Sequence, residues 1–245
     1  MTDTESHLTT LRNDFGLHPV FAVELEFYVY DAMSEAEILE TLDSICKDCH
    51  PGEKERGENQ YEIALMPVKD VAEFIRRATN LRKVIAAHFD ADFRAKPFAD
   101  DYGSALHFHL HLEDENGRNV FTRSEEGEYS APLLHTLGGL LATMQENLKI
   151  FSPNNMSRFT SAGKNAPTHL SWGPNNRSVA LRLPDKPLDN KHIEHRVASA
   201  DANIAECVQA ILQGVVYGLQ HQSDPGEPTY GNAWDNQYTL KPLLG

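Results

Sequence analysis

The sequence has few cysteines and no long apolar run, and each shortage excludes a class of protein. Three cysteines among 245 residues cannot form the disulfide framework of a small secreted domain and agree with a reducing compartment. Apolar runs such as 20–23 and 84–87 fall far short of the roughly 18 residues that a membrane span requires. The N-terminal stretch MTDTESH carries neither the basic nor the apolar segment of a secretory signal. We therefore expect a cytoplasmic protein with no membrane partner.

Positive charge is also scarce, with 22 Lys and Arg residues against 36 Asp and Glu residues and a formal net charge of −14. A polyanion such as a nucleic acid is therefore disfavoured as a partner. The sequence contains no GxxxxGK[ST] loop, so it gives no support to P-loop nucleotide binding. A hydrophobic content of 40% nevertheless fits a globular protein rather than a disordered one.

The run CKDCH at residues 46–50 matches the CxxCH pattern for covalent haem attachment. That attachment ordinarily needs export to an oxidising compartment, and the export signal is lacking. Both cysteines also lie near the end of a helical pattern formed by Ile38, Leu42 and Ile45. We therefore interpret Cys46 and Cys49 as ordinary small hydrophobic residues at a helix end.

No internal repeat or Gly/Ser-rich linker divides the sequence, which predicts a single domain over residues 1–245. Apolar and polar residues alternate in three segments, which predicts strands. Short connections between some strands favour an α+β fold, an antiparallel or mixed sheet with helices packed on one side. Strands are expected at 19–30, 60–65, 105–112, 168–172, 178–183 and 192–197, and helices near 38–45, from Pro67 to Phe89, at 132–150 and at 203–220.

The polar faces of these predicted strands concentrate potential metal ligands. Charged residues at every second position are common on a strand face that contacts solvent. Glu24 and Glu26 alone would therefore be interpreted as such a solvated face. Together with His107, His109 and His111 in the strand expected at 105–112 and the IEHR segment at 193–196, however, they favour a cation-binding site. Several carboxylates with one imidazole suit Mg²⁺ or Mn²⁺ better than structural zinc. The candidate ligands are Glu24, Glu26, Glu55, Glu62, His107, His109, His111 and Glu194.

Arginines form a second group in the later half of this acidic chain, at Arg158, Arg177, Arg182 and Arg196. Individually each could form a surface ion pair, which contributes little. Together with metal-binding carboxylates, they indicate a phosphoryl-transfer site in which cations offset the charge of an anionic transition state.

Six motifs in order, over about residues 19–236, resemble the catalytic domain of the glutamine synthetase family. VELEF at 23–27 resembles the ExEF strand of that family, and residues 55–63 resemble its ExGPGQxEI segment. Residues 103–109 are similar to GSGMHxH, and residues 172–184 to WGxxNRS followed by RIP. Residues 193–196 and 202–203 resemble IExR and the AN of SxAN.

The resemblance implies a curved, mostly antiparallel sheet with helices on its outer side. It also implies an ATP-dependent carboxylate–amine ligase that forms a γ-glutamyl amide through an acyl phosphate. The expected substrates are therefore an amino acid, an amine and ATP, with Mg²⁺ or Mn²⁺ as cofactor. One metal position is assigned to Glu26, Glu55 and Glu62, and the other to Glu24, His107 and Glu194.

The same resemblance assigns the remaining site residues. Gly103, His107, Arg158 and Arg196 correspond to the binding site of the amino acid, and His109, Arg177 and Arg182 to the nucleotide or the transferred phosphoryl group. Arg158, Asn165 and Arg177 occupy the catalytic positions.

Departures from the family pattern bear on activity more than on fold. Asn165 replaces the flap glutamate, and an amide cannot act as a general base at neutral pH. Tyr102 replaces the asparagine before the GSGMHxH glycine, and His192 replaces a basic residue. Asn165 and Tyr102 predict an altered acceptor, an amine other than ammonia, whereas His192 bears on the contacts with phosphate and adenine.

Length is the largest departure, because about 18 residues before the first strand leave no room for the family's N-terminal β-grasp domain. A ring-shaped dodecamer with shared sites is therefore not expected. A homo-oligomer or a partner chain that supplies the missing domain stays open. A non-catalytic protein that binds a metal, a nucleotide or an amino acid is the main alternative, and a kinase that stops at phosphoryl transfer is a minor one.

Overall fold

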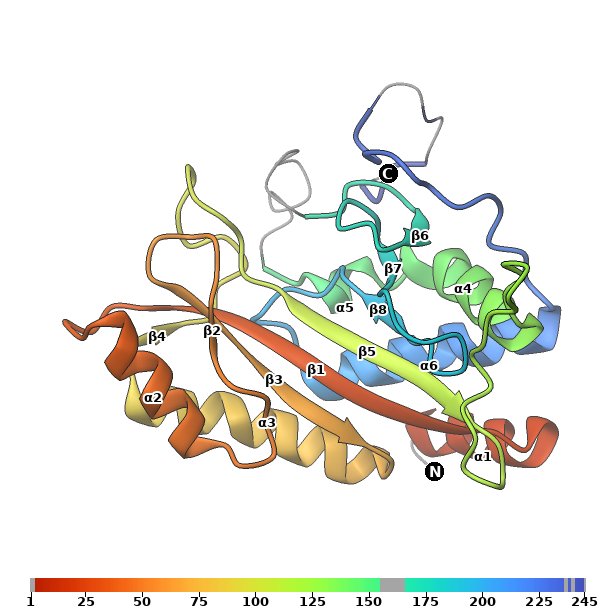
Figure 1. The fold of residues 1–245 in the computed structure, drawn as a ribbon, viewed down its shortest axis with the longest axis horizontal. Helices are drawn as coiled ribbons and strands as arrows, with labels where there is room; N and C mark the ends of the chain where they lie inside the picture. The colour runs from red at the N-terminus through yellow and green to blue at the C-terminus, as the bar shows by residue number, and fades with distance from the viewer. Residues whose placement is uncertain (1–2, 155–165, 236–237, 239–240, 245) are drawn as a thin grey trace.

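A computed structural model of the chain describes residues 3–154, 166–235, 238 and 241–244. Its centre is an eight-stranded sheet in the order β2-β3-β1-β5-β8-β7-β6, with β4 paired to β1 outside this path (Figure 1). Neighbouring strands are antiparallel, apart from the parallel pair β6 and β7. The mixed, mostly antiparallel sheet predicted from the sequence is confirmed.

The longest strand, β1, lies in the middle of the sheet and sets the register of its neighbours. Glu26 of β1 lies opposite Glu62 of β3, and Glu24 lies opposite His107 of β5. The strands are β1 (His18–Val29), β2 (Glu53–Lys54), β3 (Gln60–Val68), β4 (Ala91–Asp92), β5 (Leu106–Glu113), β6 (Trp172–Pro174), β7 (Leu181–Leu183) and β8 (Ile193–His195).

Three helices, α2, α3 and α6, begin at side chains that accept hydrogen bonds from free N–H groups of the first turn. Ser34 forms a capping box with Glu37 at the start of α2, and Asn203 accepts hydrogen bonds from the first turn of α6. The helices are α1 (Asp3–Phe15), α2 (Glu35–Ile45), α3 (Val71–His88), α4 (Ala131–Met144), α5 (Leu148–Phe151) and α6 (Ile204–His221).

The apolar face of the sheet packs against α3, which runs beside β1 and β3 (Figure 1). Phe21 of β1 stacks on Phe74 of α3 with ring centroids 5.3 Å apart, and Phe108 of β5 meets Phe74 edge-on at 6.3 Å. All three rings are fully buried. Because successive side chains of a strand point to opposite faces, this packing turns the polar residues of β1, β3 and β5 to the other face.

The helices α4 and α6 cross at a glycine contact that allows unusually close backbones. A Cβ atom on Gly139 of α4 would lie 2.2 Å from the carbonyl oxygen of Gly214 and 2.4 Å from the Cα atom of Gly218, both in α6. Any side chain at Gly139 would therefore push the helices apart.

Several boundaries differ from the predictions. Pro67 lies within β3, where the β1–β3 register shifts, rather than at a helix start, because Asp70 caps α3 by accepting a hydrogen bond from the Glu73 N–H group. The expected helix at 132–150 divides into α4 and α5, with residues 145–147 between them. The pattern did not predict α1, and β6, β7 and β8 are shorter than the alternation suggested. Within the described residues, no helix combines the length and apolar character needed to cross a membrane.

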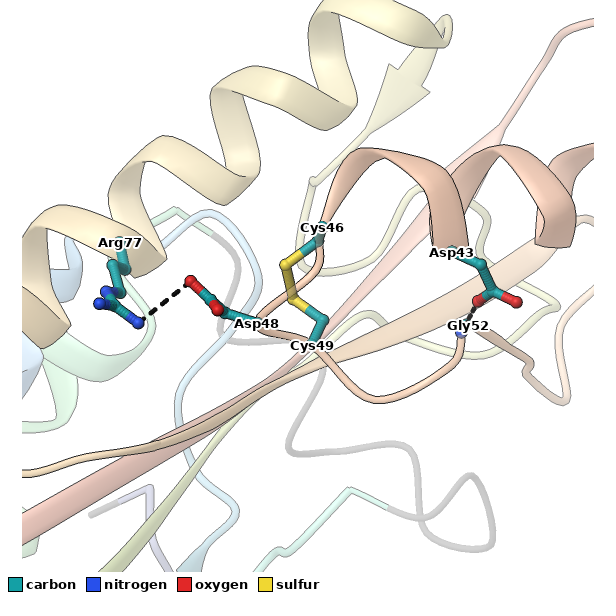
Figure 2. The surroundings of a disulfide bond; sticks show 6 residues. All are labelled: Asp43, Cys46, Asp48, Cys49, Gly52 and Arg77. Carbon is teal, nitrogen blue, oxygen red and sulfur yellow. Dashed lines mark hydrogen bonds and ion pairs between the residues drawn. A yellow bond between two sulfur atoms is a disulfide. The ribbon is translucent and has the colours of Figure 1, made fainter.

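The interpretation of Cys46 and Cys49 as simple hydrophobic residues was wrong, because the two form a disulfide (Figure 2). The turn after α2 brings their Cα atoms to 5.4 Å, within the range that a disulfide spans. Cys207 is buried and unpaired, as a small hydrophobic residue would be.

Candidate functional site

The polar face of β1, β3 and β5 forms the floor of a cavity of about 320 Å³. The six predicted metal ligands line it, together with Gly103, Arg177, Arg182 and Arg196. His109 lines an adjoining cavity of about 470 Å³, which shares Glu24 and Arg182 with the first. Arg158 and Asn165 lie outside the described residues. The structure thus brings together the carboxylates, one imidazole and three arginines that the sequence suggested.

Among the described residues that line this cavity, two groups of three side chains could each hold a metal ion. Within each group, the three ligand atoms lie within 4.8 Å of one another. The first group is Glu26, Glu55 and Glu62, as predicted. The second contains Glu24 and His107 with Glu62, in the place where the sequence predicted Glu194. Glu62 is therefore shared by both groups, and its position opposite Glu26 and next to Glu24 follows from the strand register.

The carboxylates repel one another in this cavity. Burial, followed by the charges of Glu24 and Glu26, raises the pKa of Glu62 well above its ordinary value. Burial and the charge of Glu26 also raise the pKa of Glu55. Concentrated negative charge with incomplete internal compensation is the electrostatic environment that a divalent cation stabilises.

Glu24 behaves differently because two histidines lie beside it. Its Oε2 atom lies 3.2 Å from Nδ1 of His107, and its Oε1 atom lies 3.0 Å from Nε2 of His109. Burial alone would raise the pKa of Glu24, but the interactions with these histidines outweigh it and lower that pKa. Burial likewise opposes protonation of His109, yet Glu24 raises the pKa of His109 above its ordinary value.

Glu194 holds two arginines in fixed positions. Its Oε2 atom accepts a hydrogen bond of 2.7 Å from Nη1 of Arg182, and its Oε1 atom accepts one from Nη1 of Arg196. The Glu194 side chain is 1% exposed, and burial is outweighed by Arg196 and nearby histidines, which lower the pKa of Glu194 to about 2. Both oxygens of Glu194 therefore orient guanidinium groups towards the cavity, where they can meet an anion.

The adjoining cavity is rich in imidazoles. His109 and His192 lie with ring centroids 5.1 Å apart, and His111 also lines the wall. Burial, then the charges of His109 and Lys186, lowers the pKa of His192 to about 3. His192 is therefore neutral at physiological pH and cannot replace the charge of the basic residue found in the family pattern.

The loop that carries Glu55 is tied to the loop that carries Gly103. Gln60 donates a 2.9 Å hydrogen bond to the Gly103 carbonyl and accepts one of 3.0 Å from the Gly57 N–H group. A Cβ atom on Gly57 would lie 2.2 Å from the hydroxyl oxygen of Tyr28, so this turn needs a glycine. Gln60 therefore positions both loops, a role that was not predicted from the sequence although Gln60 lies within the ExGPGQxEI-like segment.

Two lysines in the cavity wall, Lys96 and Lys186, were also missed. Neither belongs to a motif, and only the fold brings them to the carboxylates from distant parts of the chain. The donor set itself fits a hard divalent cation, because it consists of carboxylate oxygens with one imidazole. The arginines and lysines that line the same cavity suit an anionic ligand.

Curated relatives with similar sequences are named as ligases of glutamate and amines. The chain is 31% identical to "Gamma-glutamylputrescine synthetase PuuA" of Escherichia coli, over 91% of the chain and 56% of that protein. It is 32% identical to "Glutamate--isopropylamine ligase" of Pseudomonas sp, over 74% of the chain and 40% of that protein. It is 29% identical to "Gamma-glutamylethanolamide synthetase GlnA4" of Streptomyces coelicolor, over 82% of the chain and 42% of that protein. The chain therefore spans about half the length of these relatives.

Solved structures share the fold at lower identity. The structure described as "GmaS/ADP complex-Conformation 1" aligns with a TM-score of 0.82 at 22% identity, over 99% of the chain and 64% of its own length. Residues 34–242 match the family described as "Glutamine synthetase, catalytic domain". The chain thus belongs to the glutamine synthetase family, through the catalytic domain.

Proposed function

We propose that this chain is the catalytic domain of an ATP-dependent ligase that joins the γ-carboxylate of glutamate, or of a similar amino acid, to an amine. The observation that carries this proposal is that clustered carboxylates and Arg177, Arg182 and Arg196 line the same cavity. Phosphoryl transfer to a carboxylate needs cations that offset charge on both the donor and the acceptor, and this cavity offers both cation-binding and anion-binding groups.

Mg²⁺ or Mn²⁺ is the proposed metal, held by Glu26, Glu55 and Glu62 at one position and by Glu24, Glu62 and His107 at the other. Bound there, the metal would supply positive charge beside the transferred phosphoryl group. Because Glu62 belongs to both groups, we propose it as a shared ligand. For Glu194 we retain the predicted metal role only beside its role in orienting Arg182 and Arg196.

In the proposed reaction, the γ-phosphoryl group of ATP is transferred to the substrate carboxylate, which gives an acyl phosphate and ADP. The amine then attacks the acyl carbon, the amide bond forms, and phosphate leaves with loss of a proton from the amine. Arg182 and Arg196 are already fixed by Glu194, so they can orient an anionic substrate without a further loss of side-chain freedom. Arg158 is proposed to bind the substrate amino acid, Arg177 and His109 to contact the nucleotide, and Asn165 to lie in the flap.

An alkylamine is the proposed acceptor, since three of the relatives are named for putrescine, isopropylamine and ethanolamide products or substrates. Replacement of the flap glutamate by Asn165 and the presence of Tyr102 agree with an acceptor other than ammonia. We further propose a single catalytic domain in a cytoplasmic protein, because the described strands share one sheet and the reaction consumes ATP.

The test is phosphate release from ATP with Mg²⁺ or Mn²⁺, glutamate, and a panel of ammonium, alkylamines and diamines. Release that depends on an amine supports the ligase, and the Glu24→Gln variant should abolish it by removing a metal ligand. Glutamate-dependent release without an amine would indicate an acyl phosphate lost to water. Metal binding without any release would favour a binding protein, or a subunit that requires a further chain.

A further inference from the structure

The disulfide between Cys46 and Cys49 lies at the start of the segment that supplies one wall of the site (Figure 2). Cys46 caps the C-terminus of α2, and Cys49 is buried and forms a β-bridge with Leu65 of β3. His50, Pro51, Glu53 and Glu55, which follow at once, all line the 320 Å³ cavity. The crosslink is thus only a few residues from a proposed metal ligand.

Cys46 is accessible to a small thiol. It is half-buried and borders a surface cavity of about 250 Å³, whose wall also contains Lys47, Arg76 and Arg77. The thiolate is the form that attacks a disulfide. Lys47 offers it a positive charge, whereas the charges of Arg76 and Arg77 are offset by ion pairs with Glu73 and Asp48. Cys49 is 7% exposed, so an incoming thiolate reaches the Cys46 sulfur more readily.

Backbone pairs with β3 flank the segment from Cys49 to Glu55 at both ends, with a break at residues 51 and 52. The His50 N–H group donates a 2.8 Å hydrogen bond to the Ala64 carbonyl, and Glu53 then lies opposite Glu62 of β3. The Glu55 N–H group donates a 2.8 Å hydrogen bond to the Gln60 carbonyl. Residues 49–55 therefore follow the edge of β3, and the register of this edge sets the position of the Glu55 carboxylate.

Few other contacts anchor residues 50–53, whereas Lys54 donates hydrogen bonds to the carbonyls of Glu55 and Gly57. Cys49 is the one buried residue between Lys47 and Arg56. Asp43 of α2 accepts a hydrogen bond of 2.8 Å from the Gly52 N–H group, and Asp48 pairs with Arg77 of α3 at 3.1 Å on the surface (Figure 2). A segment with little buried contact and exposed backbone hydrogen bonds opens at low cost, so loss of a covalent anchor has a local effect.

We propose that Cys46–Cys49 is a thiol–disulfide exchange site for dithiol reductants, and that its redox state controls the order of residues 50–57 and hence the position of Glu55. Disulfides in a reducing compartment are usually transient or redox-sensing rather than structural. The consequence for metal binding rests on the proposed function, whereas the exchange reaction and the change in order do not.

The exchange consumes one dithiol. A thiolate of the reductant attacks the Cys46 sulfur and forms a mixed disulfide, and Cys49 leaves as a thiolate that takes up a proton. The second thiolate of the reductant then attacks the reductant sulfur that is bonded to Cys46. This closes a disulfide within the reductant and releases Cys46 as a thiolate, which takes up a proton. The reductant becomes a disulfide, and the protein gains two thiols, two electrons and two protons.

The test compares the purified chain in oxidised dithiothreitol and in reduced dithiothreitol, without denaturant. Thiol titration of the native protein should rise from none to two, because Cys207 is buried, and titration in denaturant should rise from one to three. Hydrogen–deuterium exchange of the amides of residues 50–57 should become about tenfold faster after reduction. Mn²⁺ titration of both states should show about tenfold weaker binding in the reduced protein, the size expected when outer support of a metal site is lost.

A Cys46→Ser/Cys49→Ser variant should exchange residues 50–57 rapidly in both conditions, and Cys207→Ser is the matched control that should respond as the wild type does. The wild-type comparison decides the question even if a variant fails to fold. A disulfide that resists reduction until the protein unfolds overturns the proposal, as does equal exchange of residues 50–57 in both states. Failure of Mn²⁺ to bind either state would refute the proposed metal site, while the exchange data would still decide this inference.

Discussion

Glu194 and Glu24 are both proposed at the metal site, yet the structure predicts losses of stability of very different size when each is replaced by glutamine. Glu194 is 1% exposed and holds Arg182 and Arg196, whose side chains are 16% and 4% exposed. Glu194→Gln removes the charge that compensates both guanidinium groups, while the glutamine retains nearly the same shape. Removing one partner of a buried ion pair costs about 3–5 kcal/mol, because it leaves an uncompensated buried charge.

Glu24 has a more exposed side chain, at 27%, and it interacts with two histidines rather than with arginines. Glu24→Gln keeps an oxygen that can accept a hydrogen bond from either histidine, and it removes one charge from the repelling carboxylates. We expect a loss of about 1 kcal/mol or less in the free energy of unfolding. Both variants should weaken Mn²⁺ binding, so metal affinity does not distinguish the roles of the two glutamates. The free energy of unfolding does.

The assay is urea unfolding without metal, followed by the fluorescence of the two tryptophans, of which Trp172 is 3% exposed. For a chain of this size, the loss in Glu194→Gln corresponds to a fall of roughly 10 °C in melting temperature. Equal losses of stability in the two variants would refute the assignment of Glu194 as the residue that fixes the arginines. A wild-type melting temperature in Glu194→Gln would refute it as well.

Gly57→Ala should weaken Mn²⁺ binding about tenfold, because the added Cβ atom would meet Tyr28 and displace the loop that carries Glu55; isothermal titration measures the change, and unchanged affinity would contradict the loop's role. Gly139→Ala should lower the free energy of unfolding in urea by about 1–3 kcal/mol, since the helices have no room for a side chain, and a stable variant would show that the crossing can adjust. Burial lowers the pKa of His195 to about 3, so below about pH 6.5 the unfolded chain binds a proton that the folded chain does not. The free energy of unfolding should therefore fall as the pH drops from about 6.5 towards 3, by up to about 1.4 kcal/mol per pH unit. Thermal melts across that range should show a flatter slope for His195→Gln. Mn²⁺ at 100 times its dissociation constant should stabilise the protein by about 2.7 kcal/mol, and its affinity should decline at low pH because the raised pKa of Glu62 lets a proton compete with the metal; affinity independent of pH would argue against Glu62 as a ligand.

The spacing of apolar residues along the sequence was enough to predict the main strands and helices. Val23, Leu25 and Phe27 alternate with Glu24 and Glu26, and the fold buries this apolar face, which removes it from water. The long apolar pattern of α6 was equally clear, and Asn203 marked its start. The prediction that Pro67 begins a helix was wrong, because the sequence alone does not distinguish a proline at a strand irregularity from a proline at a helix start.

The identities of the candidate ligands were therefore set by the sequence, since alternation places Glu24, Glu26 and His107 on polar strand faces. Only the tertiary structure decided which ligands meet. The pairing of β1 with β3 and β5 brings Glu62 between both groups, and the burial of two arginines draws Glu194 towards them. The disulfide was decided in the same way, because CxxC spacing becomes a bond only when a turn brings the two Cα atoms within reach. Local periodicity specifies which side of an element is polar, whereas distances between elements depend on register and packing that no single segment contains.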